Sequence, residues 1–247
     1  MDIKGRTAFV TGGNTGMGKA ISLDLANHGA NVCIGYFDFE DQAFELEKEI
    51  KALGVNAKAY KLNIADEENV ITVMNQVEED FGELAALVNC AGRTYVIPHE
   101  DLYAMKSEYF DNIFNVNVKG TFFCCREAKR LLDKNGGAIV NITSTAGLNG
   151  KGSCIAYAAS KAAEINMTRS LARVFAPKVR VLSVAPGLVH TQFTAQMTKE
   201  RFEKLAGETL LQRLVTPEEV AAVVGGLIYG NDILSGITVA ADGGREF

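Results

Sequence analysis

A tyrosine and a lysine, Tyr157 and Lys161, stand four positions apart in the strongly helical segment YAASK. Residues four apart on a helix share one face, so the two side chains can reach a common point. An isolated tyrosine has a pKa of about 10, too high for a general base at neutral pH, and a neighbouring cation lowers that pKa. A helical Tyr and Lys four apart are, however, more often a solvated surface pair, so their meaning depends on the residues around them.

Ser144 is a third candidate for chemistry. It follows an expected strand, Ala138–Ile142, and therefore lies at the carboxyl edge of a sheet. This is the edge where α/β proteins bind their ligands. A hydroxyl group at this place could hold a substrate oxygen.

A glycine-rich segment, TGGNTGMG at residues 11–18, directly follows the first expected strand and opens the first expected helix. A dinucleotide site requires this context. Gly12 would allow a tight turn, Gly16 would let the backbone approach a pyrophosphate at the helix N-terminus, and Gly18 would allow close packing of helix on strand. The alternative is a tight strand-to-helix turn that merely tolerates glycine.

Short apolar β-rich runs alternate with longer segments of helical period along the whole chain. This pattern predicts an α/β fold in one domain over 1–247, a doubly wound, Rossmann-type parallel sheet of about seven strands with helices on both faces. Strands are expected at Thr7–Thr11, Asn31–Tyr36, Ala57–Leu62, Leu84–Asn89, Ala138–Ile142, Val179–Val184 and Ile237–Ala240. Helices are expected at Gly16–His28, Phe39–Leu53, Glu67–Phe81, Ser107–Leu132, Ser153–Phe175 and Pro217–Tyr229. The least regular region, Gly187–Gly207, predicts a substrate lid around 188–207.

Bulk properties exclude several classes of protein. With 47% hydrophobic and 22% charged residues the chain is neither disordered nor fibrous. The net charge of -5 comes from scattered acids, and Lys and Arg form no run suited to a phosphate backbone, so no nucleic acid is expected. No apolar run is long enough to span a membrane, and no signal peptide is expected. Five cysteines and three histidines without metal-ligand spacing predict reduced thiols, no metal site and a cytoplasmic location.

Taken together, these motifs resemble those of the short-chain dehydrogenase/reductase family. The matching elements occur in family order over nearly the whole chain: TGGNTGMG, NCAG at Asn89–Gly92, Asn117 in NVNVKG, Ser144, Tyr157-x-x-x-Lys161, and Pro186-Gly187 with Thr191. The resemblance implies an NAD(P)-dependent oxidoreductase that moves a hydride between nicotinamide and a secondary alcohol or ketone. It also implies the catalytic roles. Ser144 would position the substrate oxygen and Tyr157 would transfer the proton. Lys161 would contact the nicotinamide ribose and lower the Tyr157 pKa, and Asn117 would support a water leading to Lys161.

The resemblance further implies where the cofactor lies. The expected contacts are Gly12, Asn14, Thr15, Gly16, Met17, Gly18, Tyr36, Phe37, Asp38, Asn63, Ile64, Asn89, Ala91, Gly92, Tyr157, Lys161, Pro186, Gly187, Val189 and Thr191. Family members usually have Asp where Asn63 stands and commonly Asn where Cys90 stands. We expect Cys90 to point into the core and Asn89 to line the cleft. No Arg or Lys ends the second strand, and Asp38 would repel a 2'-phosphate, so NAD(H) is favoured over NADP(H).

The segments expected to face the substrate, 93–99, 145–155 and 188–205, are mostly apolar. Their candidate lining residues are Tyr95, Val96, Ile97, Leu148, Ile155, Leu188, Phe193, Met197, Phe202 and Leu205. A hydrophobic alcohol or ketone such as a hydroxysteroid therefore fits better than a free sugar. The same motifs support a 3-oxoacyl-[acyl-carrier-protein] reductase equally well, and a dinucleotide-sensing regulator without turnover is the alternative from another class. Apolar residues on more than one helix face suggest a subunit interface, and the resemblance implies a homotetramer, with a dimer as fallback.

Overall fold

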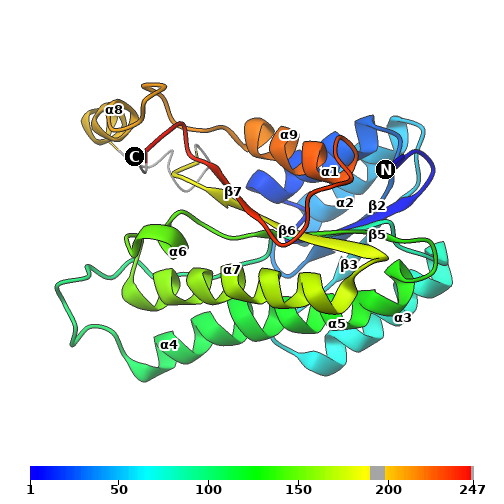
Figure 1. The fold of residues 1–247 in the computed structure, drawn as a ribbon, viewed down its shortest axis with the longest axis horizontal. Coiled ribbons are helices and arrows are strands. Elements are labelled where there is room, and N and C mark those ends of the chain that lie inside the picture. Colours follow the sequence, from blue (N-terminus) through cyan, green and yellow to red (C-terminus); the bar gives the residue numbers. More distant parts are fainter. Residues whose placement is uncertain (190–197, 246–247) are drawn as a thin grey trace.

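The structure is a computed structural model in which residues 1–189 and 198–245 are described. Within these residues, seven strands form one sheet in the order β3-β2-β1-β4-β5-β6-β7 (Figure 1). Every neighbouring pair is parallel, which confirms the predicted doubly wound α/β fold. The strands are β1 (Thr7–Thr11), β2 (Asn31–Tyr36), β3 (Ala57–Lys61), β4 (Ala86–Asn89), β5 (Gly137–Ile142), β6 (Val179–Pro186) and β7 (Thr238–Ala241).

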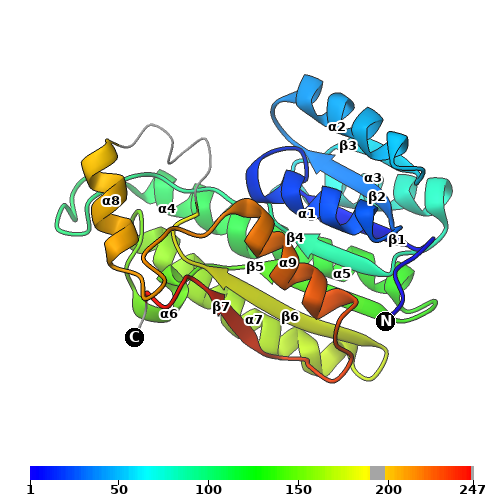
Figure 2. The same ribbon diagram turned by 90° about the horizontal axis from the view of Figure 1, so that it is seen from above.

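Helices cover both faces of this sheet, as Figures 1 and 2 show. One face carries α1 (Gly16–Asn27), α2 (Glu40–Ala52) and α9 (Pro217–Ile228), whose apolar side chains join those of the strands in one core. The other face carries α3 (Glu67–Phe81), α4 (Ser107–Phe114), α5 (Thr121–Leu132) and α7 (Ile155–Phe175). Two short helices, α6 (Ala146–Asn149) and α8 (Lys199–Gly207), lie toward one end of the molecule. Among the described residues, none of the helices is both long and apolar enough to cross a lipid bilayer.

The strands are buried because the sheet is covered on both sides. All residues of β1, β4 and β5 are buried, as the continuous apolar runs of the sequence predict. The chain starts in the middle of the sheet, runs outward to β3 and then crosses back to β4, beside β1. Such a reversal of strand order opens a crevice at the carboxyl ends of the two central strands, where ligands of this fold class bind.

The expectation of one regular helix over Ser107–Leu132 is wrong in its middle. A π-helical segment, η1 (Asn115–Gly120), separates α4 from α5. Gly120 passes so close to the chain after β3 that an added Cβ would lie 2.8 Å from the carbonyl oxygen of Ile64. The wider turn of a π-helix inserts one residue without ending the helix, and such insertions are frequent at functional sites. Here it turns Asn117 inward, where that side chain is fully buried.

The region expected to be least regular also contains a helix, since α8 covers Lys199–Gly207. The rest of the expected lid falls partly on 190–197, which lies outside the described residues. Local features fix the ends of several helices. Thr216 and Glu219 form a capping box with Pro217 in the first turn of α9, and Gly29 and Gly54 follow their helices with left-handed φ values of 84° and 87°.

Candidate active site

The parallel strands bring most of the predicted site residues to one edge of the sheet. The glycine segment follows β1, Asp38 follows β2, and Asn63 follows β3. Ala91 and Gly92 follow β4, Ser144 follows β5, and Gly187 follows β6. Because all these strands point the same way, their carboxyl ends form a single row that spans the crevice between β1 and β4.

The glycine segment has the shape that its sequence predicts. Gly12 and Gly16 have positive φ values of 62° and 49°, which favour glycine. A Cβ on Gly12 would lie 3.0 Å from the Cα of Ala91, and a Cβ on Gly18 would overlap the carbonyl oxygen of Gly12. Thr15 provides no side-chain cap, and the first turn of α1 carries no acid. The amides of that turn therefore present partial positive charge at the crevice, which suits a phosphate.

Asn14 does not offer its side chain to the crevice as a free group. It is buried, and its Nδ2 donates to the carbonyl oxygens of Asp38, at 2.8 Å, and Phe39, at 3.1 Å. This amide ties the glycine segment to the chain that leaves β2. The side chains of Phe37 and Asp38 are exposed beside it, where a ribose of the cofactor is expected.

Tyr36 and Ile64, also expected to touch the cofactor, have buried side chains. The Tyr36 hydroxyl donates to Glu40 Oε1 at 2.5 Å, and burial, together with this carboxylate, raises the pKa of Tyr36 to about 12. Asn63 is half-buried, and its Oδ1 accepts from the amide of Ala65 at 3.1 Å. The side chains of these residues are therefore engaged with the protein itself, and what they offer the crevice is mainly backbone.

The expectation that the Asn89 side chain lines the crevice is wrong. Asn89 is the last residue of β4 and only 3% exposed, and its Nδ2 donates to Asn141 Oδ1 at 2.8 Å. Cys90, the next residue, is half-buried and packs against the core that the strands share with α1 and α9, as expected. The backbone amides of Cys90 and Ala91 both donate to Thr11 Oγ1 at 3.1 Å, which fixes the turn after β4 against the end of β1.

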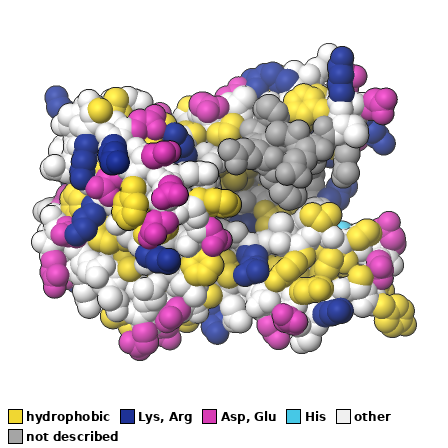
Figure 3. Space-filling view, turned by 180° about the vertical axis from the view of Figure 1, so that it is seen from behind, with side chains coloured by type: hydrophobic (Ala, Val, Ile, Leu, Met, Phe, Trp, Pro, Cys, Tyr) yellow, Lys and Arg dark blue, Asp and Glu magenta, His cyan; other side chains and the backbone are white. Residues whose placement is uncertain are grey.

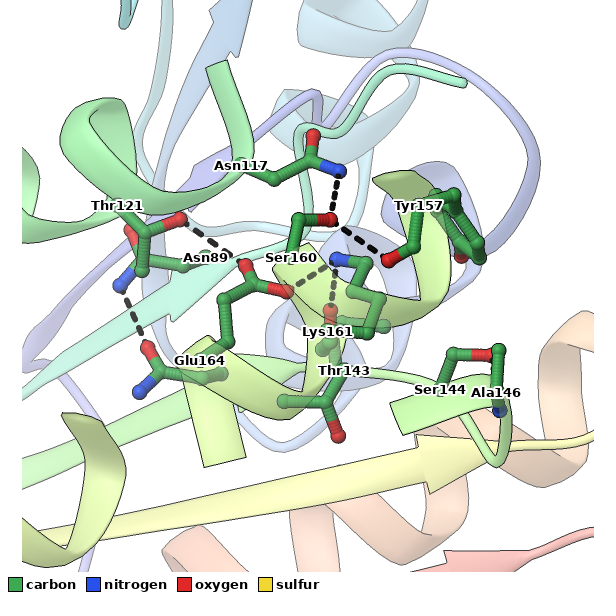
Figure 4. A network of polar contacts seen from close by, with 12 residues as sticks. Asn89, Asn117, Thr121, Thr143, Ser144, Ala146, Tyr157, Ser160, Lys161 and Glu164 are labelled. Atoms are coloured by element: carbon green, nitrogen blue, oxygen red, sulfur yellow. Dashed lines mark hydrogen bonds and ion pairs between the residues drawn. The ribbon is translucent and has the colours of Figure 1, made fainter. Parts of the chain in front are cut away.

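Asn117 is placed at the centre of the site by the π-helical segment. Its Oδ1 accepts from the amide of Arg93 at 2.8 Å, and its Nδ2 donates to the Arg93 carbonyl at 3.0 Å. The same Nδ2 donates to Ser160 Oγ at 2.9 Å, as Figure 4 shows. A Cβ on Gly92 would lie 3.6 Å from Asn117 Oδ1 and 3.7 Å from Lys161 Nζ. Asn117 thus joins the chain after β4 to α7, directly beside the lysine.

Tyr157 and Lys161 share one face of α7, as their spacing predicts. Lys161 Nζ lies 5.8 Å from the centroid of the Tyr157 ring and donates to the carbonyl oxygen of Ile142 at 2.9 Å. Lys161 is only 4% exposed. Burial by itself would lower the pKa of Lys161, but the carboxylate of Glu164 outweighs it and raises that pKa above its ordinary value. The lysine is therefore held as a cation beside the phenol.

Glu164 is a site residue that the sequence reasoning missed. It is 1% exposed, and its Oε2 forms an ion pair with Lys161 Nζ at 2.6 Å. Its Oε1 accepts from Thr121 Oγ1 at 3.2 Å, as Figure 4 shows. Burial raises the pKa of Glu164, and Lys161 opposes that rise. A signal was present in the sequence, because a glutamate three residues after Lys161 lies on the same helix face.

Ser144 is half-buried in the turn after β5, and its Oγ accepts from the amide of Ala146 at 3.1 Å. The short helix α6 that follows packs directly on α7. A Cβ on Gly147 would lie 2.6 Å from the carbonyl carbon of Lys161. This close approach carries the Ser144 turn to the side of α7 that bears Tyr157 and Lys161 (Figure 4).

The Tyr157 ring borders an apolar cluster formed by the segment after β4, α4 and the start of α7. The cluster has a buried centre of Ile97, Ile113, Cys154 and Ala156, against which Tyr95, Ala104, Met105, Tyr109, Phe114 and Tyr157 pack. Leu148 and Ile155, also expected to face the substrate, are 50% and 39% exposed. The apolar surroundings predicted from the sequence are thus present on one side of the tyrosine.

The end of β6 completes the row. The carbonyl oxygen of Pro186 accepts from the amide of Thr145 at 3.0 Å, and Gly187 lies so close to Asp242 that an added Cβ would be 2.8 Å from the Asp242 Cβ. Val189 is 7% exposed and pairs with Val215, so its side chain belongs to the core. Thr191, Phe193 and Met197 lie outside the described residues.

Known proteins resemble this chain in sequence and in structure. A family model described as short chain dehydrogenase matches residues 6–201. A 3-oxoacyl-[acyl-carrier-protein] reductase of Staphylococcus aureus is 34% identical over 242 residues, 97% of either chain, and one of Thermotoga maritima is 34% identical over 249 residues, 99% of either chain. Among solved structures, a short-chain dehydrogenase/reductase from Burkholderia xenovorans superposes with a TM-score of 0.92 at 31% identity over 98% of both chains. Another, from Serratia marcescens, gives 0.92 at 30% identity over 100% of both.

Proposed function

The chain belongs to the short-chain dehydrogenase/reductase family and is an NAD(P)-dependent oxidoreductase. Within that class we propose that it interconverts a hydrophobic ketone and its secondary alcohol through Ser144, Tyr157, Lys161 and Asn117. The observation that carries the proposal is the buried Lys161 cation, whose Nζ lies 5.8 Å from the Tyr157 ring at the carboxyl edge of the sheet. A cation fixed beside a phenol stabilises the phenolate that proton transfer produces.

Each residue has one task in this scheme. Ser144 holds the substrate oxygen beside the Tyr157 hydroxyl. In reduction, Tyr157 donates its proton to that oxygen, and in oxidation the phenolate takes the proton back. Asn117 binds both the Arg93 carbonyl after β4 and Ser160 on α7. It therefore holds the segment after β4 in a fixed position relative to the helix that carries Tyr157.

The crevice fits a nicotinamide dinucleotide. The uncapped amides of the first turn of α1 would hold the pyrophosphate, and Gly12 and Gly18 leave room that a Cβ would fill. Asp38, with its neighbours, would take the adenosine ribose. Gly92 leaves space above Lys161, where the second ribose would lie. When bound, the nicotinamide supplies or accepts the hydride, so the chain itself needs only to orient the partners and move a proton.

For the cofactor, we propose a preference for NAD(H) over NADP(H). Asp38 is exposed at the end of β2, and two more acids, Glu40 and Asp41, stand in the first turn of α2. Three carboxylates in this short stretch disfavour a 2'-phosphate by like-charge repulsion, whereas an acid accepts both ribose hydroxyls.

For the substrate, the apolar cluster beside Tyr157 supports a hydrophobic carbonyl compound. A hydroxysteroid and a 3-oxoacyl thioester both meet this requirement. The relatives named above as 3-oxoacyl-[acyl-carrier-protein] reductases favour the thioester, which we therefore rank beside the steroid. A dinucleotide-sensing regulator is disfavoured because it has no use for a phenol, a buried lysine and a serine at one edge of the sheet.

The deciding experiment is a turnover assay that follows the absorbance of reduced nicotinamide. NADH and NADPH are each offered with steroid, acyl-thioester, sugar and small aliphatic ketones. We expect turnover of a hydrophobic ketone with NADH, and a loss of about 1000-fold or more in kcat for Tyr157→Phe, because general acid catalysis is removed. Tyr103→Phe is the matched control, since that ring is 99% exposed on a loop. Cofactor binding without turnover of any ketone would contradict the enzyme proposal and favour the regulator.

A further inference from the structure

Glu164 has no part in the proton and hydride steps just described, yet it is among the most deeply buried charges of the described chain. It is 1% exposed and pairs with Lys161, which is 4% exposed. Burying a carboxylate is costly unless it is paired and hydrogen-bonded, and Glu164 has both an ion pair and the Thr121 hydroxyl. A charge held this firmly against Lys161 must alter what the lysine does for Tyr157.

The effect follows from counting charges. With Glu164 ionised and Lys161 protonated, the buried pair is neutral, and removing a proton from Tyr157 leaves one net negative charge in the site. Without the Glu164 charge, and with Lys161 still protonated, the same removal would leave the site neutral. Charge in a poorly solvated site is expensive, so the carboxylate makes the first proton harder to remove. Because Tyr157, Lys161 and Glu164 interact strongly, the pH at which this proton is lost is a property of the three groups together.

We propose that Glu164 is a positioning residue which, through Lys161, keeps Tyr157 protonated and so prepares the site for carbonyl reduction rather than alcohol oxidation. This inference rests on the proposed function, because it gives Tyr157 the proton-transfer role. Glu164 acts in two ways. It fixes Lys161 Nζ between its own Oε2 and the Ile142 carbonyl, and it offsets the charge that would otherwise draw a proton from the phenol.

The other titratable groups around this cluster do not change charge over the same pH range. Cys90, on the segment after β4, interacts electrostatically with Lys161, and Cys125, on α5, with Glu164; burial raises the pKa of each thiol to about 12. The remaining polar neighbours, Thr121 on α5 and the Ile142 carbonyl on β5, are neutral. Among the described residues in contact with the pair, Tyr157 is therefore the group whose proton Glu164 can control.

The first test is an ultraviolet titration of tyrosinate in Glu164→Gln, which removes the charge and keeps the size of the side chain. Absorbance from Tyr157 is isolated by subtracting the titration of the same chain with Tyr157→Phe. We expect the Tyr157 signal in Glu164→Gln to develop about one pH unit or more below that of the unchanged chain. A signal at the same or higher pH would overturn the proposal.

A matched control is Glu127→Gln on α5, which removes another partly buried glutamate paired with a cation, Arg126. Its titration should coincide with that of the unchanged chain. Glu164→Met provides a second variant without the charge and must shift the signal in the same direction as Glu164→Gln.

The reciprocal variant, Lys161→Met, tests the pair without altering Glu164. A buried carboxylate that has lost its counter-ion should take up a proton near neutral pH, which infrared spectroscopy detects as a carboxylic-acid carbonyl band. A carboxylate that stays ionised in this variant would contradict the proposed pairing, whether or not the Glu164 variants fold.

Kinetics then connect the charge to the direction of the reaction. In Glu164→Gln, kcat for ketone reduction should begin to fall at a pH about one unit lower than in the unchanged chain, and alcohol oxidation should rise at a correspondingly lower pH. The KM for the ketone should change little, because Glu164 does not touch the substrate crevice. The titrations need no substrate, so a titration shift in a chain that turns nothing over would support the pairing and refute the proposed function. Turnover without a titration shift would support the proposed function and refute the role proposed for Glu164.

Discussion

Lys161 is held in place by two polar partners. Its Nζ contacts groups from two elements, the Ile142 carbonyl at the end of β5 and the Glu164 carboxylate on α7, and lies beside Asn117 below Gly92. A cation held in advance at the place where charge develops needs no reorganisation during reaction. The buried location strengthens this effect because water screens little of the field.

Asp38 is expected to control the choice of cofactor. Asp38→Asn removes one exposed charge without changing the size of the side chain. We expect the ratio of kcat/KM for NADPH to that for NADH to rise roughly twofold to fivefold, since an exposed charge contributes only about 1 kcal/mol or less. Glu45→Gln, an exposed acid farther along α2, is the control and should leave the ratio unchanged. An unchanged ratio in Asp38→Asn would remove the basis for the NAD preference.

Single residues were predictable where type and spacing carried the chemistry. Tyr157 and Lys161 share a helix face because they are four apart, and Ser144 is at the strand end that the apolar run predicts. Asn89 was misjudged because its orientation depends on which face of β4 it occupies, and a short apolar strand does not reveal this. The sequence does not identify Glu164 because glutamates on helices are usually solvated, whereas this one is buried and bonded to Thr121 at the start of α5.

Among the elements, the turn between β1 and α1 depends on the absence of side chains. In Gly18→Ala the new Cβ would overlap the Gly12 carbonyl oxygen, a backbone atom that cannot rotate away. We expect the loss of roughly 1–3 kcal/mol of stability, by denaturant unfolding, and weaker cofactor binding, by fluorescence titration with NADH. Gly226→Ala is the control, because its Cβ would meet nothing within 4 Å and an alanine suits α9. Unaltered NADH binding in Gly18→Ala would argue against a pyrophosphate at this turn.

The contact between α6 and α7 makes a separate prediction. A Cβ on Gly147 would lie 2.6 Å from the carbonyl carbon of Lys161, so Gly147→Ala must push α6, and with it Ser144, away from α7. We expect kcat to fall by about tenfold or more while the KM for the nicotinamide cofactor stays nearly constant, because misplaced catalytic groups act on the chemical step. A proportional rise in cofactor KM would mean that α6 supports the cofactor rather than the serine.

The elements themselves followed from periodicity, whereas their irregularities did not. The strands and most helices lie within a few residues of their predicted bounds because buried strands and amphipathic helices have distinct apolar patterns. The sequence predicts ordinary helix over the π-helical segment Asn115–Gly120, since an inserted residue changes the pattern by less than one turn. The short helix α6 was not predicted either, because four residues are too few to show a period.

At the scale of the whole molecule, two separate apolar surfaces point to self-association. One lies over α4, the segment before it and the start of α5, where the exposed residues are Leu102, Tyr103, Phe110 and Phe122. Hydrophobic side chains gather in this part of the molecule, toward the lower right of Figure 3. The other includes Leu210 and Leu211, which are 72% and 62% exposed, between α8 and α9. Two distinct isologous interfaces are what a tetramer of identical chains requires.

We therefore expect light scattering at micromolar concentration to give a mass near four times the 26.6 kDa of one chain. If the α4 surface is one of the two interfaces, Phe110→Ser should reduce the assembly to dimers. If the surface with Leu210 and Leu211 is an interface, Leu211→Ser should have the same effect. Lys48→Ser, far from both surfaces on α2, is the control for loss of a long side chain. A monomeric mass for the unchanged chain would refute the tetramer and the dimer alike.

The hydrogen bonds from Asn14 to the carbonyl oxygens of Asp38 and Phe39 have a practical consequence for engineering. They connect the glycine segment, which would hold the pyrophosphate, to residues 36–41, which would select between NAD(H) and NADP(H). Because these bonds go to backbone carbonyls, basic side chains can replace those of residues 36–41 without removing them, provided that the backbone there does not move. A change of cofactor preference in this chain therefore calls for residues 14 and 36–41 to be redesigned together. The charges would be exchanged while both Asn14 hydrogen bonds are kept.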